Sequence, residues 1–244
     1  MIYSPFPPGI LIIGGEPTAV KNSVEFWSAT DPEEGSCELA DYPRSMRGGQ
    51  TADFVSGRII ACFDRSCEFY QEGHWTHLHD TIESRKDHST ATNGEAILLI
   101  GGFLKESTEW IALDGSYARP GPFEVRHGYN HCTMQPSPDV IVVTGGHGTQ
   151  TPMAYVTRYH LTGDGNETPM TPMHRGRFVH ACGIYQHNNQ QVRKLCTLAI
   201  VKKSDLASGN SFFFMIFFRI CLEYFSGFFD QNEVQTFFLT FRSH

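Results

Sequence analysis

The sequence predicts an all-β fold made of repeated units, because three features recur along it in the same order. The first feature is an apolar run that ends in a glycine pair, found at residues 10–15, 96–102 and 140–146. Gly14 and Gly101 are 87 residues apart, and Gly101 and Gly145 are 44 apart. A period of about 44 residues therefore fits if a weaker copy lies near residue 60. That copy is the segment GRIIACFD, 57–64, in which Cys and Phe replace the glycines.

Two further features keep step with the apolar runs. One is an arginine three residues before Gln, His or Tyr, in the pairs Arg47/Gln50, Arg85/His88, Arg126/Tyr129 and Arg177/His180. The other is Ser-x-Glu-aromatic, whose glutamates are Glu25, Glu68 and Glu109. Three independent features in one order indicate a true repeat, whereas a single glycine pair would not.

Each unit is predicted to hold four short strands. The Arg-x-x-His segment comes first, followed by the apolar run with its glycines, the Ser-x-Glu-aromatic segment, and a polar strand such as HWTHL. The connections are rich in Gly, Pro, Asn and Asp, which favour turns. No stretch before residue 191 has a helical period of apolar residues.

These units resemble kelch repeats, which form the four-stranded blades of a β-propeller. The resemblance covers about residues 9–191 and depends on the doublets Gly14/Gly15, Gly101/Gly102 and Gly145/Gly146, each followed by an aromatic-bearing strand. In the weaker unit Phe69, Tyr70 and Trp75 keep the aromatic spacing although Cys62 and Phe63 stand at the glycine positions. The resemblance implies an incomplete propeller of about four blades.

The pattern has a physical reason at each position. The apolar strand is expected to be buried between neighbouring blades and hence apolar on both faces. The glycines supply a positive φ and a close backbone approach that a side chain would block. The arginines and glutamates are expected along blade edges, where charged hydrogen bonds connect one strand to the next.

The chain is expected to divide into a partial propeller, residues 1–191, and a phenylalanine-rich tail, residues 192–244. After residue 191 the repeat predicts another apolar Gly-Gly strand near residue 197, but VRKLCTLAIVKK stands there instead. Residues 1–191 hold 13 Lys/Arg against 22 Asp/Glu, and residues 192–244 hold 6 against 4. We therefore expect a fragment of a larger propeller with an unrelated, non-repeat tail, as a truncated or mis-spliced product would give.

The tail contains one strongly hydrophobic segment, residues 211–229, which includes Arg219 and Glu223. Three interpretations stay open: a transmembrane helix, a segment that covers the open edge of the propeller, or a tail without a fold of its own, which is favoured. About 20 apolar residues span a bilayer, so this segment is the only expected route to a membrane.

Composition excludes some partner classes. The formal net charge of -7 argues against nucleic acid, which demands a basic surface. The first residues lack the basic region of a secretory signal. The compartment stays open: cytoplasmic if the N-terminus is complete, with an extracellular location as the alternative.

No chemical site is predicted with residues in catalytic roles. The glycine pairs lack the pattern of a phosphate loop. His74, His77 and His79 are expected on a surface strand rather than at zinc. The pairs Cys62/Cys67 and Cys132/Cys182 suit disulfides in an oxidising compartment, but buried free thiols are the favoured interpretation. Among propellers, copper-radical oxidases need a paired Tyr and Cys with two His. Tyr129, His131 and Cys132 lie close in sequence but are expected to be structural.

The predicted function is a non-catalytic scaffold for protein interaction, with no cofactor and no metal. Its propeller loops would bind another protein, of unknown identity. The alternatives are an enzyme similar to the propeller oxidases of the copper-radical type, and a membrane-tethered or extracellular propeller.

Overall fold

The computed structural model describes residues 9–13, 22–28, 36–44, 51–148, 151–163, 165–186, 193–198 and 237–238. Every regular element in these ranges is a β-strand. No helix long and apolar enough to cross a membrane occurs in them. The predicted positions Gly14, Gly15 and Arg47, and the hydrophobic segment 211–229, lie outside the described residues.

The strands form five sheets that follow one another along the chain. All strand pairs in them are antiparallel except one pair in the first sheet, which is parallel. The first sheet contains β1 (Gly9–Ile13), β2 (Val24–Ser28) and β3 (Ser36–Leu39), with β17 (Phe237–Phe238) parallel to β1. The second contains β4 (Thr51–Val55), β5 (Arg58–Gln71) and β6 (His74–Arg85). The third contains β7 (Ser89–Thr92), β8 (Ala96–Gly102), β9 (Lys105–Ala112) and β10 (Ala118–Glu124). The fourth contains β11 (Cys132–Ser137), β12 (Val140–Thr144), β13 (Val156–His160) and β14 (Glu167–Pro169), and the fifth β15 (Ala181–Gln186) and β16 (Arg193–Leu198).

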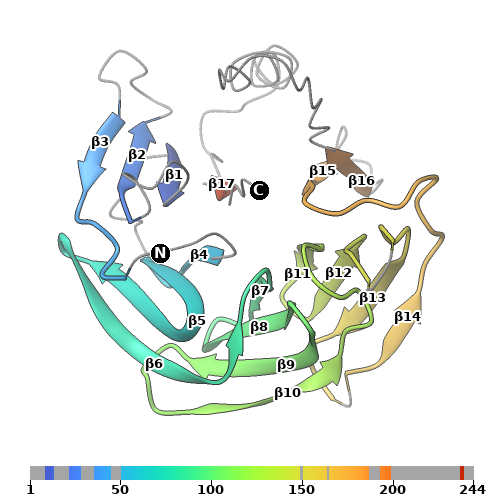
Figure 1. Cartoon of the computed structure of the whole chain (residues 1–244), viewed down its shortest axis with the longest axis horizontal. Coiled ribbons are helices and arrows are strands. Elements are labelled where there is room, and N and C mark those ends of the chain that lie inside the picture. Colours follow the sequence, from blue (N-terminus) through green and yellow to red (C-terminus); the bar gives the residue numbers. More distant parts are fainter. Residues whose placement is uncertain are drawn as a thin grey trace.

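The sheets stand around a common axis, with one edge strand of each sheet, β17, β4, β7, β11 or β15, nearest the centre (Figure 1). Strand β7 packs against β4 on one side and β11 on the other, and β11 packs against β15. The last strands, β6, β10 and β14, lie at the periphery (Figure 1). This order follows from short hairpin turns, which place consecutive strands side by side.

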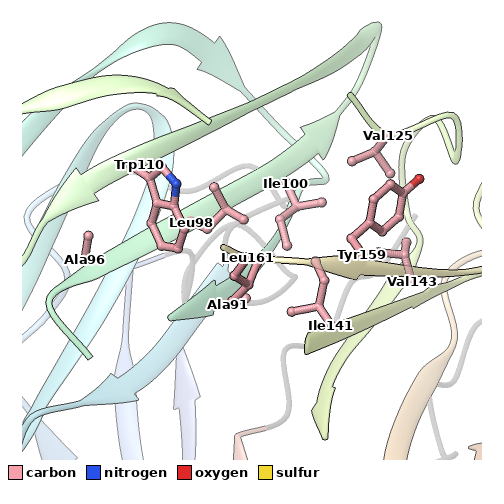
Figure 2. Packing of buried hydrophobic residues seen from close by; sticks show 10 residues of the cluster. All are labelled: Ala91, Ala96, Leu98, Ile100, Trp110, Val125, Ile141, Val143, Tyr159 and Leu161. Carbon is pink, nitrogen blue, oxygen red and sulfur yellow. The ribbon is translucent and has the colours of Figure 1, made fainter. Parts of the chain in front are cut away.

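The hydrophobic core is divided into layers between successive sheets. Strand β8 is buried along its whole length, and its side chains alternate between two layers. Ile97 and Leu99 pack toward the second sheet, whereas Leu98 and Ile100 pack toward the fourth sheet, in the layer shown in Figure 2. The predicted burial of the apolar strand on both faces is therefore observed. Each such side chain contributes about 1.5–3 kcal/mol when removed from water.

Strand β5 differs from the other apolar strands because it reverses direction within its length. Its first half pairs with β4 and its second half with β6. The Cα atoms of Cys62 and Cys67 are 4.1 Å apart, although five extended residues would span about 16 Å. Asp64, between them, has a φ of 57°. The chain therefore turns at Asp64 where the other units use glycines.

The strand register corrects the alignment of this weaker unit. Thr51 is opposite Cys62, as Ser89 is opposite Ile100 in the third sheet. Cys62 consequently corresponds to Ile100, and the two glycine positions fall on the residues that follow Cys62, Phe63 and Asp64. The sequence pattern predicts the glycine positions one residue earlier, at Cys62 and Phe63, because the apolar run itself contains no marker of its end.

The predicted boundary at residue 191 falls between two paired strands. Strand β16, in the segment assigned to the tail, pairs with β15 over six residues, from Ala181 opposite Leu198 to Gln186 opposite Arg193. A second strand thus occupies the position where the repeat predicted an apolar Gly-Gly strand. Backbone pairing does not require the glycines, so the strand forms without them.

Candidate functional site

The two described glycine doublets share one backbone geometry and lie at the same end of their sheets. Gly101 and Gly102 have φ angles of 60° and 129°, and Gly145 and Gly146 have 63° and 105°. A Cβ atom on Gly102 would lie 2.9 Å from the Lys86 carbonyl oxygen, within the same unit. Positive φ and this close approach both select glycine. The doublets therefore bring each turn against the loop that leads into its own sheet.

The first glycine of each doublet faces the next sheet. A Cβ on Gly101 would lie 3.0 Å from the Cε1 atom of His131, and one on Gly145 would lie 2.5 Å from that of His180. The side chains of these histidines thus fill the space that a Cβ would need. The glycines consequently set the spacing between neighbouring sheets.

A row of histidines connects the inner strands of successive sheets. The Nε2 atom of His88 is 2.8 Å from Thr51 Oγ1, and that of His131 is 2.8 Å from Ser89 Oγ. In the fourth-to-fifth junction His180 Nε2 is 2.9 Å from Thr144 Oγ1. Burial, with a smaller effect of the Arg177 charge, lowers the pKa of His180 to about 4. The ring is therefore neutral at pH 7, as a hydrogen-bonded core residue should be.

The inner strands also hold one carboxyl group with an unusual pKa. Asp53 on β4 accepts a hydrogen bond from the Phe54 backbone at 2.9 Å. Burial raises the pKa of Asp53 to about 6, although hydrogen bonds from Phe54 and Thr90 lower it. Asp53 and Thr90 stand on neighbouring inner strands, so this contact connects the second sheet to the third.

One predicted Arg–Glu pair joins Arg85, the last residue of β6 in the second sheet, to Glu109 on β9 in the third sheet. Arg85 and Glu109 are both almost fully buried, and Arg85 Nε is 3.2 Å from a Glu109 carboxylate oxygen. The guanidinium also donates to the carbonyl oxygens of Gly101, at 3.0 Å, and Ser107, at 2.7 Å. A buried ion pair is stable only when such bonds satisfy the remaining donors. Arg85 therefore connects the Gly-Gly turn to the strand after it.

The second sheet builds the same contact from other residues. The carboxylate of Glu68 pairs with Arg44, whose Nε lies 3.1 Å away, and accepts a hydrogen bond from the Tyr42 hydroxyl. Burial, together with the Glu68 charge, raises the pKa of Tyr42. Arg44 was not singled out in the sequence. Its spacing of 41 residues from Arg85, which equals the spacing from Arg85 to Arg126, would have identified it.

In the fourth sheet the position of Arg126 is exposed, and His127 makes the buried contact instead. His127 Nδ1 lies 2.8 Å from the Gly145 carbonyl oxygen, as Arg85 lies near that of Gly101. His127 Nε2 lies 2.9 Å from Thr157 Oγ1, which stands on β13 where β9 has its glutamate. A neutral pair thus replaces the ion pair. Burial accordingly lowers the pKa of His127.

Within the part of the chain that the structure describes, Arg177 and Glu25 form no such ion pair. Arg177 contributes its backbone: the Gly146 N–H donates to the Arg177 carbonyl oxygen at 2.8 Å. Glu25 on β2 is half-buried, opposite Ile12 and Glu38 in the strand register. The repeat positions therefore share one place in the fold but use different atoms there.

Both predicted cysteine pairs are disulfides, which corrects the expectation of free thiols. Cys62 is bonded to Cys67 across the reversal in β5, and Cys132 on β11 is bonded to Cys182 on β15. Cys132 begins the inner strand where other units place Thr51 or Ser89. The disulfide thus uses the strand position at which Thr51 and Ser89 contact a histidine in the two preceding junctions.

One cluster has the composition of a catalytic triad but not its accessibility. Ser66 Oγ is 3.2 Å from His77 Nδ1, and His77 Nε2 is 3.6 Å from an Asp80 carboxylate oxygen. Ser66 is fully buried, and its hydroxyl lies 2.5 Å from Glu68. A nucleophile must reach a substrate carbon, and this hydroxyl faces the protein interior. The cluster is structural.

The other chemical candidates are also separated or occupied. His131 Nε2 contacts Ser89, and Cys132 is in a disulfide, so neither joins Tyr129 in a ligand set. In the part of the chain that the structure describes, no group of three or more His, Cys, Asp or Glu side chains is arranged to hold a metal ion.

The most distinctive surface is a row of aromatic side chains at the Gly-Gly end. We call Phe103, Tyr129, His147 and Phe178 the aromatic row. Neighbouring ring centroids are 5.0, 5.3 and 4.8 Å apart along the row. Phe103 is 49% exposed and Phe178 39% exposed. These residues come alternately from Gly-Gly turns and from loops between sheets.

Backbone hydrogen bonds hold the aromatic row in place. Tyr129 and His147 form an antiparallel bridge, in which the His147 N–H donates to the Tyr129 carbonyl oxygen at 2.9 Å. The Phe103 N–H donates to the Lys86 carbonyl oxygen at 2.7 Å. The rings therefore stand on loops that are fixed before any partner arrives, which lowers the entropic cost of binding.

Comparison with known proteins supports the architecture at a coarse level. No protein-family model and no curated protein sequence matches the chain. The structure is similar to the solved structure of YjhT, a kelch-type β-propeller, with a TM-score of 0.61 and 12% sequence identity over 74% of this chain and 70% of that chain. At this identity the likeness shows the fold alone. The chain thus has an all-β, propeller-like fold of antiparallel sheets.

Proposed function

We propose that the chain is a kelch-type propeller segment that acts as a non-catalytic scaffold and binds a partner protein on its aromatic row. The observation that supports this function is the row itself: Phe103 and Phe178 are large apolar side chains, well exposed, at the two ends of a continuous line of rings. Aromatic side chains dominate the energetics of protein interfaces. A rigid row of this kind is suited to recognise a protein segment.

The polar groups at the same end support a binding role over a catalytic one. His127, His131 and His180 each contact a hydroxyl group of the protein itself. A general acid or base needs to reach the proton of a substrate, whereas these rings are engaged by the protein itself, His127 within the fourth unit and the other two between sheets. The surface they leave to a partner consists of rings and loop side chains.

The proposal is tested with short random peptides displayed on phage. Peptides selected on the wild-type protein should bind at least about tenfold more weakly to the double variant Phe103→Ser/Phe178→Ser, because the apolar ends of the row are lost. The matched control is Ile82→Ser on β6, which removes an apolar side chain of similar exposure, 50%, from a strand that supplies no ring to the row. Selected peptides that ignore the double variant, or that depend equally on Ile82, would contradict the proposal.

A metal assay separates the scaffold from the oxidase alternative. Purified protein is incubated with copper and then desalted, and its copper content is measured. We expect no stoichiometric copper, because Tyr129, His131 and Cys132 do not converge. One bound copper per chain would contradict the scaffold.

A further inference from the structure

The two ends of the sheets differ in charge, and the difference follows from the topology. In a sheet of antiparallel strands, the first and third turns lie at one end, whereas the second turn and the loop to the next sheet lie at the other. The residues of the aromatic row lie in the second turns and in the loops to the next sheet. We call that end the row end, and the other the far end.

Cations gather in the turns and loops of the row end. The charged residues there are Arg44, Arg65, Lys86, Arg126, Arg175 and Arg177, against Asp41, Asp64 and Asp87. All these cations except Arg177, which is half-buried, are exposed. Of the five ion pairs found among the described residues, one uses a cation of this end, the pair of Arg44 with Glu68. Lys86 lies over the ring of Phe63, 5.9 Å from its centroid, whereas the exposed Arg65, Arg126 and Arg175 are open to solvent or a partner.

The far end has the opposite charge. Its described turns include four exposed carboxylates, those of Glu72, Glu95, Asp114 and Asp139. The same turns, 56–57, 72–73, 93–95, 113–117, 138–139, 161–163 and 165–166, contain no lysine or arginine. The chain as a whole is acidic, with a net charge of -7, so the row end is basic against the average of the molecule.

The cations are close to the rings along the chain. Arg177 precedes Phe178 directly, and Arg126 lies three residues before Tyr129 in the same loop. Lys86 is joined to Phe103 by the backbone hydrogen bond of 2.7 Å. Every turn or loop that supplies a ring to the row is thus paired with a cation, or lies next to a loop that has one.

We propose that the aromatic row binds an extended acidic segment of a partner protein. This inference rests on the proposed function and specifies its partner. Carboxylates of the segment accept hydrogen bonds from the arginines and Lys86, and its apolar groups lie on the rings. The three steps between centroids limit the row to at most about 15 Å, the length of four to five extended residues. Opposite charges also accelerate association, and salt weakens it.

Two measurements follow from the phage selection. First, the peptides that depend on Phe103 and Phe178 should be enriched in Asp and Glu. Second, one such synthetic peptide is compared by fluorescence anisotropy with its amide version, in which every Asp is Asn and every Glu is Gln. We expect the amide version to bind about tenfold more weakly and the acidic version to weaken with added salt.

Matched variants locate the charge effect. Arg126→Gln/Arg175→Gln should weaken the acidic peptide about tenfold and leave the amide peptide nearly unchanged. Glu72→Gln/Glu95→Gln, which alters the far end, should change neither. All variants are compared only after their unfolding temperatures are shown to match the wild type.

The possible failures are distinguishable. Row-dependent peptides that are neutral or basic would overturn the acidic partner while the proposed function stands. If no selected peptide depends on the row, both fail. Self-association in sedimentation that disappears in Glu72→Gln/Glu95→Gln would assign the row to the far end of a second copy, which also overturns the acidic segment of a partner.

Discussion

At the scale of single residues, the junction between sheets depends on a residue with a left-handed backbone directly before each histidine. Asp87, Asn130 and Val179 hold this position, with φ angles of 61°, 58° and 49°. Their backbones form a chain: the Asn130 N–H donates to Asp87, and the Val179 N–H donates to Asn130, each at 3.0 Å. Asn and Asp tolerate this conformation, whereas a β-branched residue is strained in it.

Val179→Asn should therefore stabilise the protein. Removal of the strained valine is expected to raise the free energy of unfolding by about 1 kcal/mol. Chemical denaturation of both proteins measures the difference. Val179→Thr is the control, because threonine is also β-branched and should give no gain; a gain of equal size in both variants would refute the explanation by strain.

His180 should make stability fall on acidification. Its folded pKa, about 4, lies below the ordinary value of 6.5, so the unfolded chain takes up a proton first as the pH falls. The native state therefore loses stability from about pH 6.5 downward, by about 2 kcal/mol at pH 4.5. The variant His180→Gln keeps a hydrogen-bonding group but does not titrate. Denaturation at pH 7 and pH 4.5 should show the smaller loss in this variant, and equal losses would show that His180 is not the cause.

At the scale of the strands, the disulfides act over very different lengths of chain. Cys62–Cys67 joins residues five apart, and Cys132–Cys182 joins residues 50 apart. The first fixes the reversal within β5. The second connects β11 to β15, and so the fourth sheet to the fifth. Disulfides persist in oxidising compartments, so we expect the chain to reach its full stability there.

Loss of the long-range bond should cost more than loss of the short one. The loop-entropy relation gives about 4 kcal/mol for Cys132–Cys182 and about 2 kcal/mol for Cys62–Cys67. The double variants Cys132→Ala/Cys182→Ala and Cys62→Ala/Cys67→Ala are compared by denaturation. Fully reduced wild type should resemble the variant without any of the four cysteines. A larger loss from the short bond would mean that local geometry, not chain entropy, dominates.

The strand scale also shows what sequence can predict. The buried run of β8 and its Gly-Gly turn were predictable, because burial on both faces and a positive φ restrict the residue types. The sequence did not predict that His127 and Thr157 make, in the fourth unit, the contact that Arg85 and Glu109 make in the third. Several donor–acceptor pairs fit the same space, so the repeat specifies the contact but not the residues.

The aromatic row was hidden in the sequence for a related reason. Its members come from two kinds of loop, so they are not equally spaced along the chain. Phe103 follows a glycine doublet, whereas Phe178 follows Arg177 in a loop between sheets. Only the folding of consecutive sheets brings them into one line. The tail beyond residue 198 stays a prediction, except that Phe237 and Phe238 pair with β1.

At the scale of the whole molecule, stability is unevenly distributed among the sheets. The third sheet has a core layer on each face, whereas the described side chains of the layer between the fourth and fifth sheets include three buried apolar residues, Met134, Val142 and Val156. Regions with less buried apolar surface open more readily. The middle of the described chain should be its most stable part.

Hydrogen exchange measures this distribution. The amides of Ile97–Ile100 in β8 should exchange most slowly, and those of Ala181–Gly183 in β15 much faster. Mass spectrometry of peptides from the two strands gives both rates in one experiment. Equal protection of β8 and β15 would instead show that all the sheets unfold as a single unit.

The side chains that fill the layers between sheets differ from layer to layer, and this restricts the order of the units. The layer between the first and second sheets is rich in aromatic rings, including Phe26, Tyr42 and Tyr70, whereas the next layer is aliphatic and contains the Cys62–Cys67 disulfide. Each layer is filled by side chains from the two sheets that face it. A sheet therefore packs well only against its own two neighbours. Units that look interchangeable in sequence are thus distinct pieces with a fixed succession. Exchanging two of them within the gene would set unlike side chains against each other, so the core of this chain fixes the order of its units.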